Sequence, residues 1–264
     1  MTATRRRLLV FGGLLAWALV LGGLAVVSHR TDPPTVREQR DLAAGVGALD
    51  RALGLTVGQA GPRTVPVIMP VTINEGCRIT PMRSGATATG VVRFFTAAGG
   101  AEDFLTVLGA GYPASYLVEV STDRKALRAD AGEFVALRGK VISPEEVQVT
   151  LTTGCRPVNT AVAHLLPEYP QEAGPRDLLT ALGASVVDDE SISFAQCPAG
   201  GPTVTASAVG HGLTAGPAAA RAHDGGDLVL DTTKAYAYRR GPSEAVALLP
   251  TGGHDTRAYV TKLC

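Results

Sequence analysis

Residues 8–27 read LLVFGGLLAWALVLGGLAVV, an apolar run of 20 residues without a charged side chain. As a helix rising about 1.5 Å per residue, the run covers about 30 Å, the thickness of the hydrocarbon core of a bilayer. Arg5, Arg6 and Arg7 precede it and no acidic residue does, so the positive-inside rule predicts a cytoplasmic end at residues 1–7. The sequence therefore predicts a single-pass signal anchor in the cell membrane, with the bulk of the chain outside the cytoplasm.

Two alternatives to a permanent anchor are open. Ala25 and Ser28 each end an acceptable signal-peptidase site, although the apolar region of a signal peptide usually runs only about 7–15 residues. The arginine cluster also resembles a twin-arginine export signal, although that route favours less hydrophobic segments. We expect the uncleaved anchor, followed by a short polar spacer at residues 28–38.

The charge balance of the exterior part bears on its partners. The 264-residue chain carries 24 basic and 24 acidic residues, and without the three N-terminal arginines the balance is 21 against 24, a net charge of −3. Such a surface has no electrostatic reason to bind nucleic acid. Aromatic residues make up only 5% of the chain, which argues against broad stacking surfaces for sugars or bases. We expect membrane lipid around residues 8–27, a protein or envelope partner, and no nucleic acid.

The cysteines indicate disulfide bonds. The exterior part carries four, at Cys77, Cys155, Cys197 and Cys264. An even number outside the membrane is typical of disulfides, and four cysteines allow three pairings. Their spacing contains no CxxC motif and no close Cys/His pair, so we expect no metal and no cofactor.

The segment after the spacer predicts a helix and then an edge strand. Apolar residues recur at spacings of three and four between Leu42 and Leu53, and Gly54 is expected to close the helix. Residues 65–74 are rich in β-branched side chains and predict a strand. Pro66 and Pro70 restrict the first part of that strand to an edge or an extended loop.

The chain after Cys77 predicts antiparallel strands parted by turn residues. The expected strands are residues 87–96, 115–121, 133–142 and 146–153, with a short helix at 101–108. The last two strands are expected to form a hairpin around Ser143 and Pro144. Residues 156–176 hold four prolines and no sustained hydrophobic period, which is typical of a semi-rigid linker.

The second half repeats the first in outline, at an offset of roughly 110 residues. A helical pattern at residues 176–183 answers the one at 40–54, and a strand ending in a cysteine follows each helix. Recurrence of common residues by composition is the alternative to a duplication. Under a duplication the natural pairing is Cys77 with Cys155 and Cys197 with Cys264.

The fold class predicted is α+β. The anchor helix is followed by two similar domains, residues 39–157 and 176–264, joined by a linker at 158–175. Each domain is expected to pack one helix on an antiparallel sheet of four or five strands, with the leucine stripe of the helix buried on one face.

Side chains that could carry chemistry occur mainly in turn-like contexts. The histidines are His29, His164, His211, His223 and His254, and two of them precede an aspartate in glycine-rich stretches. No GxSxG motif is present, and Ser243 follows a Gly-Pro pair typical of a turn. The acidic runs at 145–146 and 188–190 are expected to be solvated charges beside strands. The sequence favours no catalytic residue.

The function favoured is a non-enzymatic binding or accessory role in which the tandem, disulfide-stapled domains bind a protein or envelope component. Two similar domains in series create a groove or a bivalent surface, which suits binding. The alternatives are an envelope hydrolase or transferase with an unrecognised site, and a small-molecule sensor or capture protein.

Overall fold

The computed structural model describes residues 3–31, 41–159, 174–213 and 226–264. The chain divides into two compact units, Met1–Gln39 and Arg40–Cys264. The first unit holds one helix, α1 (Ala3–Thr31), whose described side chains, at residues 12–27, are all exposed. Across the described residues, no helix has the length and apolar character needed to cross a membrane.

The predicted anchor and the predicted division at 158–175 both stay predictions. Residues 32–38 of the spacer and 160–173 of the linker lie outside the described residues.

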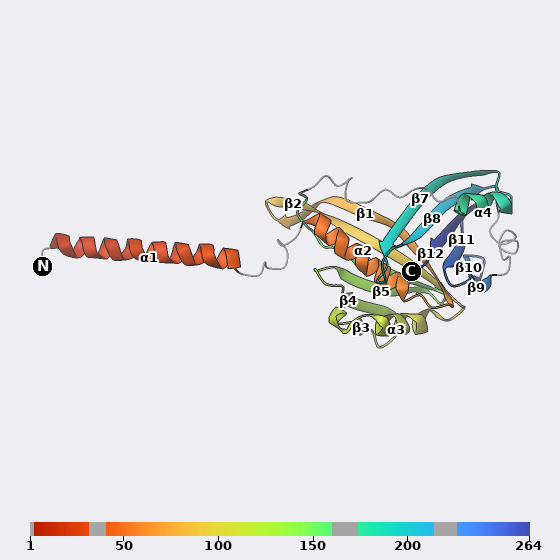
Figure 1. The fold of residues 1–264 in the computed structure, drawn as a ribbon, viewed down its shortest axis with the longest axis horizontal. Coiled ribbons are helices and arrows are strands. Elements are labelled where there is room, and N and C mark those ends of the chain that lie inside the picture. Colours follow the sequence, from red (N-terminus) through yellow and green to blue (C-terminus); the bar gives the residue numbers. More distant parts are fainter. Residues whose placement is uncertain (1–2, 32–40, 160–173, 214–225) are drawn as a thin grey trace. The chain divides into compact units, whose positions relative to one another are not determined.

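The first half of the second unit contains a six-stranded antiparallel sheet covered by two helices (Figure 1). Its strands lie in the order β1-β2-β6-β5-β4-β3. Their bounds are β1 (Thr64–Thr80), β2 (Arg83–Thr96), β3 (Glu119–Val120), β4 (Ala126–Asp130), β5 (Ala136–Ser143) and β6 (Glu146–Thr152). The helices are α2 (Leu42–Gly58) and α3 (Ala101–Gly111), and a 3-10 turn, η1 (Ala114–Tyr116), follows α3.

The second half repeats this sheet with the same strand order. Its strands lie in the order β7-β8-β12-β11-β10-β9, so each occupies the place of the strand six numbers earlier. Their bounds are β7 (Val186–Gln196), β8 (Pro202–His211), β9 (Asp227–Asp231), β10 (Tyr236–Arg240), β11 (Glu244–Gly252) and β12 (Asp255–Lys262), and the helix α4 (Gly174–Leu182) precedes them. This shared order is the arrangement that an internal duplication predicts.

Helix α2 packs on both halves of the unit. Asp41 caps its N-terminus by accepting a 3.0 Å hydrogen bond from the Ala44 N–H. Its leucines cover small residues of β2, and a Cβ at Gly90 would lie 2.8 Å from Leu53. On the other side, a Cβ at Gly54 would lie 1.8 Å from the carbonyl oxygen of Gln196, at the end of β7. The missing side chain of Gly54 therefore lets the helix touch the second half.

The two sheets share an apolar core. Val65, Val67 and Phe95 from the first sheet pack with buried residues of the second, including Leu230, Ala237, Ala247, Leu249 and Tyr259. Strand β1 lies at the edge of the first sheet. Near the start of β1, the face that points away from α2 is apolar, so this part of the strand can pack against the second sheet.

A chain of hydrogen bonds crosses the same contact. The Ile68 N–H donates to the Thr205 hydroxyl at 3.0 Å. The hydroxyl oxygens of Thr205 and Thr261 share a hydrogen bond of 2.8 Å, and the Thr261 hydroxyl donates to the Pro66 carbonyl at 2.9 Å. Each buried polar group in this chain of hydrogen bonds has a hydrogen-bond partner. Such bonds fix the position of one sheet relative to the other.

The second unit has two distinct ends (Figure 1). At the attachment end, where α2 begins, the Leu42 N–H bonds to the Pro157 carbonyl, and Arg156 pairs with Ala86 of β2. The β1–β2 turn projects from this end. At the opposite end, where α2 finishes, the Thr96 N–H bonds to Glu145 in the β5–β6 turn. Helix α2 separates the ends by about 25 Å, its 17 residues rising about 1.5 Å each.

Several sequence predictions are confirmed by these elements. Residues 136–143 and 146–152 form the expected hairpin around Ser143 and Pro144, and β1 is the expected edge strand. The α+β class is also confirmed, since each of two antiparallel sheets carries packed helices.

Other predictions are wrong in detail. Each sheet has six strands instead of four or five, because the short strands β4 and β9 give little alternating signal. Gly54 lies inside α2, which continues to Gly58. The strand expected at 115–121 is reduced to β3, since Leu117 adopts the left-handed conformation (φ 49°) directly after η1.

Candidate functional site

A cleft lies between the two sheets at the end of the unit opposite the attachment end. Its volume is about 640 Å³. Its walls come from three places in the chain: the end of β2, the β5–β6 turn, and the segment from β9 to the start of β10. The lining residues are Arg93, Phe95, Ile142, Ser143, Pro144, Glu145, Glu146, Leu230, Thr232, Thr233, Lys234 and Ala235.

The first wall carries a partly exposed ion pair over an aromatic ring. Arg93 and Phe95 are two residues apart on β2 and therefore point to the same face of the sheet. The guanidinium of Arg93 lies 5.1 Å from the centre of the Phe95 ring, and its Nε donates to the Glu146 carboxylate at 2.7 Å. Because Phe95 is buried and also packs in the core shared by the sheets, it fixes the ion pair in place.

The β5–β6 turn supplies an acidic rim to this wall. The Ser143 hydroxyl donates to the Glu145 carboxylate at 3.0 Å and accepts from the Glu145 N–H at 3.3 Å. Ile142 and Pro144 flank these polar groups. The rim thus presents one carboxylate together with two apolar side chains.

The opposite wall is a turn held by its own hydroxyl. Thr232 accepts hydrogen bonds from the N–H groups of Lys234 and Ala235, at 3.3 and 3.1 Å, and donates to the Ala235 carbonyl at 3.0 Å. Lys234 in this turn is exposed and lines the cleft, and its ammonium makes no ion pair with any described residue. The cleft therefore combines an apolar floor with one basic and one acidic group at its rim.

A second cluster, away from the cleft, surrounds His211. Its Nε2 lies 2.9 Å from the Asp188 carboxylate and its Nδ1 lies 3.1 Å from that of Asp255. The hydrogen bond to Asp188 and then that to Asp255 raise the pKa of the His211 imidazole. The His211 side chain thereby links β7, β8 and the start of β12. Among the described residues, no group of three or more His, Cys, Asp or Glu side chains is placed to bind a metal ion.

Four of the five carboxylates in the acidic runs contact basic side chains, and two of them, Asp188 and Asp189, are also more than half exposed, as expected for solvated charges. Beside Asp188, the carboxylate of Asp189 pairs with Arg257, and Glu190 pairs with Arg176. Glu146 pairs with Arg93 across the strands β6 and β2. The sequence alone does not show these partners, because Arg93, Arg176 and Arg257 lie on other elements, β2, α4 and β12, far along the chain.

The remaining candidates are not brought together. Ser243 lies in the turn between β10 and β11 as expected, and His254 lies in the turn between β11 and β12. His164 and His223 lie outside the described residues, as does the side chain of His29.

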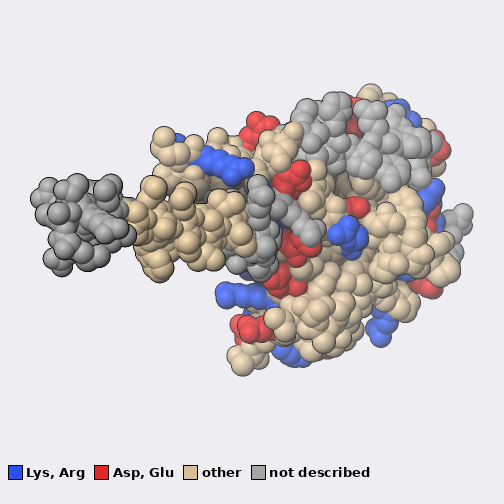
Figure 2. Space-filling view, turned by 60° about the vertical axis from the view of Figure 1, so that its left-hand side comes forward, with Lys and Arg blue, Asp and Glu red and all other residues tan. Residues whose placement is uncertain are grey.

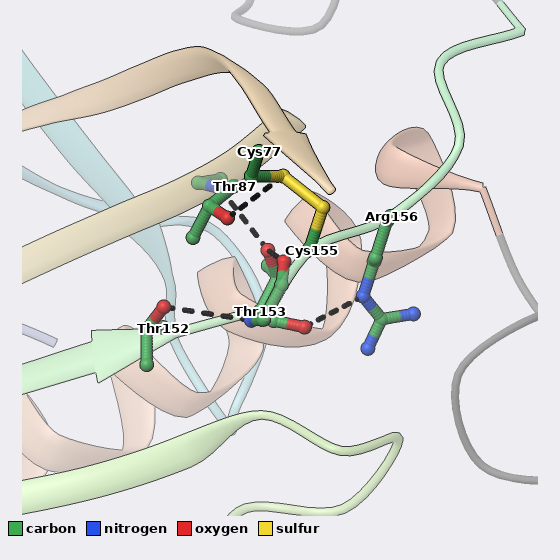
Figure 3. The surroundings of a disulfide bond; sticks show 8 residues. Cys77, Thr87, Thr152, Thr153, Cys155 and Arg156 are labelled. Atoms are coloured by element: carbon green, nitrogen blue, oxygen red, sulfur yellow. Dashed lines mark hydrogen bonds between the residues drawn. A yellow bond between two sulfur atoms is a disulfide. The ribbon is translucent and has the colours of Figure 1, made fainter. Parts of the chain in front are cut away.

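The cysteines form the pairs expected from a duplication, Cys77 with Cys155 and Cys197 with Cys264. The first pair joins the β1–β2 hairpin to the segment that follows β6 (Figure 3). Beside it, Thr87 donates to the sulfur of Cys77, and Nε of Arg156 donates to the Thr153 carbonyl at 2.9 Å (Figure 3). The disulfides are thus structural, each closing one half of the unit.

Comparisons with known proteins leave the function open. No protein-family model matches the chain. No curated protein matches it. Among solved structures, the chain is similar to the crystal structure, at 2.65 Å resolution, of a DUF4853 family protein from Actinomyces odontolyticus, with 12% sequence identity, coverage of 63% of this chain and 94% of that chain, and a TM-score of 0.36.

Proposed function

We propose that the protein is a membrane-anchored, extracytoplasmic binding protein whose cleft between the two sheets holds a segment of a protein or envelope partner. The observation that carries the proposal is the cleft itself, built from both halves and lined by apolar, hydroxyl and charged side chains. Sites of this mixed character orient a ligand through a few polar groups over an apolar floor.

The lining favours a polypeptide segment as ligand. Glu145 and Lys234 offer one charge of each sign at the rim, and the hydroxyls of Ser143, Thr232 and Thr233 can exchange hydrogen bonds with a peptide backbone. On the face drawn in Figure 2, basic and acidic side chains are interspersed and neither sign forms a broad patch. This pattern supports a protein partner over nucleic acid.

The proposed role is non-enzymatic. His211 is already bonded to two carboxylates and does not line the cleft. Among the described residues that line the cleft, no histidine lies beside the hydroxyls of Ser143, Thr232 and Thr233 to act as a base.

Two features support the anchored, exterior location. The apolar side chains of α1 between residues 12 and 27 are all exposed. A helix that is apolar on every face is stable in lipid. The two disulfides suit an oxidising compartment outside the cytoplasm.

Site-specific photo-cross-linking tests the proposal. We would place benzoylphenylalanine at Thr233, in the cleft, and separately at Val107, which is 65% exposed on α3 and outside the cleft. In membranes of cells that produce the full chain, we expect a protein adduct from position 233 and none from position 107. Adducts from both positions, or from neither, would contradict a ligand in the cleft.

A matched pair of charge substitutions adds a second readout. Ile142→Arg places a charge on an exposed wall of the cleft, whereas Val107→Arg makes the same change on α3. We expect Ile142→Arg to lower the adduct yield at position 233 about tenfold, the loss that follows when a contact worth about 1.4 kcal/mol is removed. Val107→Arg should leave the yield unchanged. A small-molecule adduct would favour the sensor alternative.

A further inference from the structure

The β1–β2 hairpin ends in a projecting tip, residues 78–84, with the sequence RITPMRS. Met82, at the turn, is 95% exposed and is the most exposed large apolar side chain of the described residues. Pro81 beside it is exposed as well. The apex therefore places an apolar side chain where it can contact another phase or molecule.

Basic side chains flank the apex without acidic partners. Arg78 and Arg83 are both exposed, and residues 78–84 contain no acidic residue. Arg78 donates to the Pro81 carbonyl at 2.7 Å, and neither arginine makes an ion pair with a described residue. The guanidinium groups are therefore available to anionic groups outside the molecule.

The tip stands on a rigid base. Arg78 is opposite Ser84 in the strand register, and the disulfide at Cys77 ties the hairpin to the segment after β6. At the next step along β2, Ala86 exchanges two backbone hydrogen bonds of 2.9 Å with Arg156. Met82 lies four residues beyond Ala86 and so projects about 13 Å past this point, at about 3.3 Å per strand residue.

The tip lies at the attachment end, beside the start of α2 (Figure 1). Leu42 at the start of α2 bonds to Pro157, directly after Arg156. Two further exposed apolar residues, Phe134 and Val158, lie near it: the carbonyl of Glu133 accepts from Arg156, and Val158 follows Pro157. Only ten peptide units join Thr31 to Asp41, so this connection spans at most about 36 Å.

We infer that the tip is a membrane contact: Met82 enters the interface of a bilayer containing anionic phospholipid, and Arg78 and Arg83 bind lipid phosphates. This inference rests on the anchor of the proposed function. Apolar apices flanked by arginine bind at the headgroup level, since the side chain enters the acyl boundary while the guanidinium stays with the phosphates. The contact keeps the attachment end at the bilayer and leaves the cleft end about 25 Å farther out, the length of α2.

Tryptophan fluorescence of the full chain in vesicles tests the contact. The only native tryptophan is Trp17, so the probe is Met82→Trp in a Trp17→Phe background. In vesicles of phosphatidylcholine and phosphatidylglycerol, we expect its emission to shift to shorter wavelength and to be quenched by lipids brominated near the headgroup. Vesicles of phosphatidylcholine alone, or the added pair Arg78→Gln and Arg83→Gln, should lose most of this quenching.

The control probe is Val107→Trp in the same background, which should show neither the shift nor the quenching. Flotation of the vesicles measures the anchor independently of the tip. If the chain floats but the probe at position 82 is not quenched, or both probes are quenched alike, the tip contact is wrong and the anchor stands. If the chain does not float, the anchor and the tip contact are both overturned.

Discussion

At the scale of single residues, Arg239 is a buried cation that joins the two halves through backbone carbonyls and makes no ion pair with a carboxylate of the described residues. It is only 5% exposed, and it donates to the carbonyls of Thr64 at 3.1 Å and Pro242 at 2.9 Å, while its Nε has no hydrogen-bond partner among the described residues. Burial lowers the pKa of the guanidinium. The contact that ties β10 to the start of β1 therefore carries an uncompensated desolvation cost.

Substitution of Arg239 separates packing from charge. Arg239→Ala removes both hydrogen bonds and leaves a void, so we expect a loss of about 2–4 kcal/mol in the free energy of unfolding. Arg239→Met fills most of the volume without a buried charge and should cost at least about 1 kcal/mol less. Urea denaturation of both variants measures the difference. Equal losses would mean that the hydrogen bonds, and not the packing, carry the contact.

His211 predicts a pH dependence of stability. Because its folded-state pKa is raised, its contribution is complete below the unfolded value of about 6.5 and is lost as pH rises through the folded value. We therefore expect His211→Gln to lose more stability at about pH 5.5 than at about pH 8.5. Chemical denaturation at the two pH values checks this.

The two carboxylates around His211 provide the control. Asp188 makes the larger contribution to the raised pKa and Asp255 the smaller one, so Asp188→Asn should reduce the pH dependence more than Asp255→Asn. The prediction is wrong if the free energy of unfolding has the same pH dependence in the wild-type protein and in His211→Gln. In that case a protonated His211 does not tie these strands together.

At the scale of elements, two glycines of α2 make opposite predictions. A Cβ at Gly54 would overlap the Gln196 carbonyl, whereas one at Gly47 would meet only the end of Arg51, at 3.7 Å. Gly54→Ala should cost about 1–3 kcal/mol or more through overpacking, although alanine favours the helix. Gly47→Ala should stabilise the protein by about 0.5–1 kcal/mol. Thermal unfolding of the pair measures both, and a stabilising Gly54→Ala would disprove the close contact of α2 with β7.

Gly54 also illustrates how far the elements follow from the sequence. Glycine after a leucine stripe commonly ends a helix, and only the approach of Gln196, more than 140 residues later, explains the place of Gly54 inside α2. The β5–β6 hairpin was predictable because Val147, Val149 and Leu151 alternate with polar residues facing solvent. Residues 115–121 alternate too, but the left-handed Leu117 breaks the strand.

At the scale of the whole molecule, the repeated outline and the disulfide pairing were predictable, whereas the cleft was not. Helix, strand and cysteine recur in the same order in both halves, which the sequence displays directly. Arg93, Glu146 and Lys234 meet at one cleft only because the two sheets pack together. No local pattern encodes that packing, since Val65, Val67 and Phe95 read as ordinary buried strand residues.

The packing between the sheets predicts that the halves stay together when the chain between them is cut. Each disulfide lies within one half, so no covalent bond other than the main chain joins them. The shared apolar core and the threonine hydrogen bonds should nevertheless hold the halves. We would insert a specific protease site between residues 160 and 173, cleave the purified full chain, and compare gel filtration with non-reducing denaturing electrophoresis.

We expect one native species that separates into two bands only after denaturation. A control variant, Val67→Asp, places an unpaired charge in the shared core and should make the cleaved halves elute separately, because burying a lone carboxylate costs several kcal/mol. If the unsubstituted halves already elute separately after cleavage, they are independent domains joined by a linker. The cleft between the sheets would then be an adjustable groove instead of a fixed site.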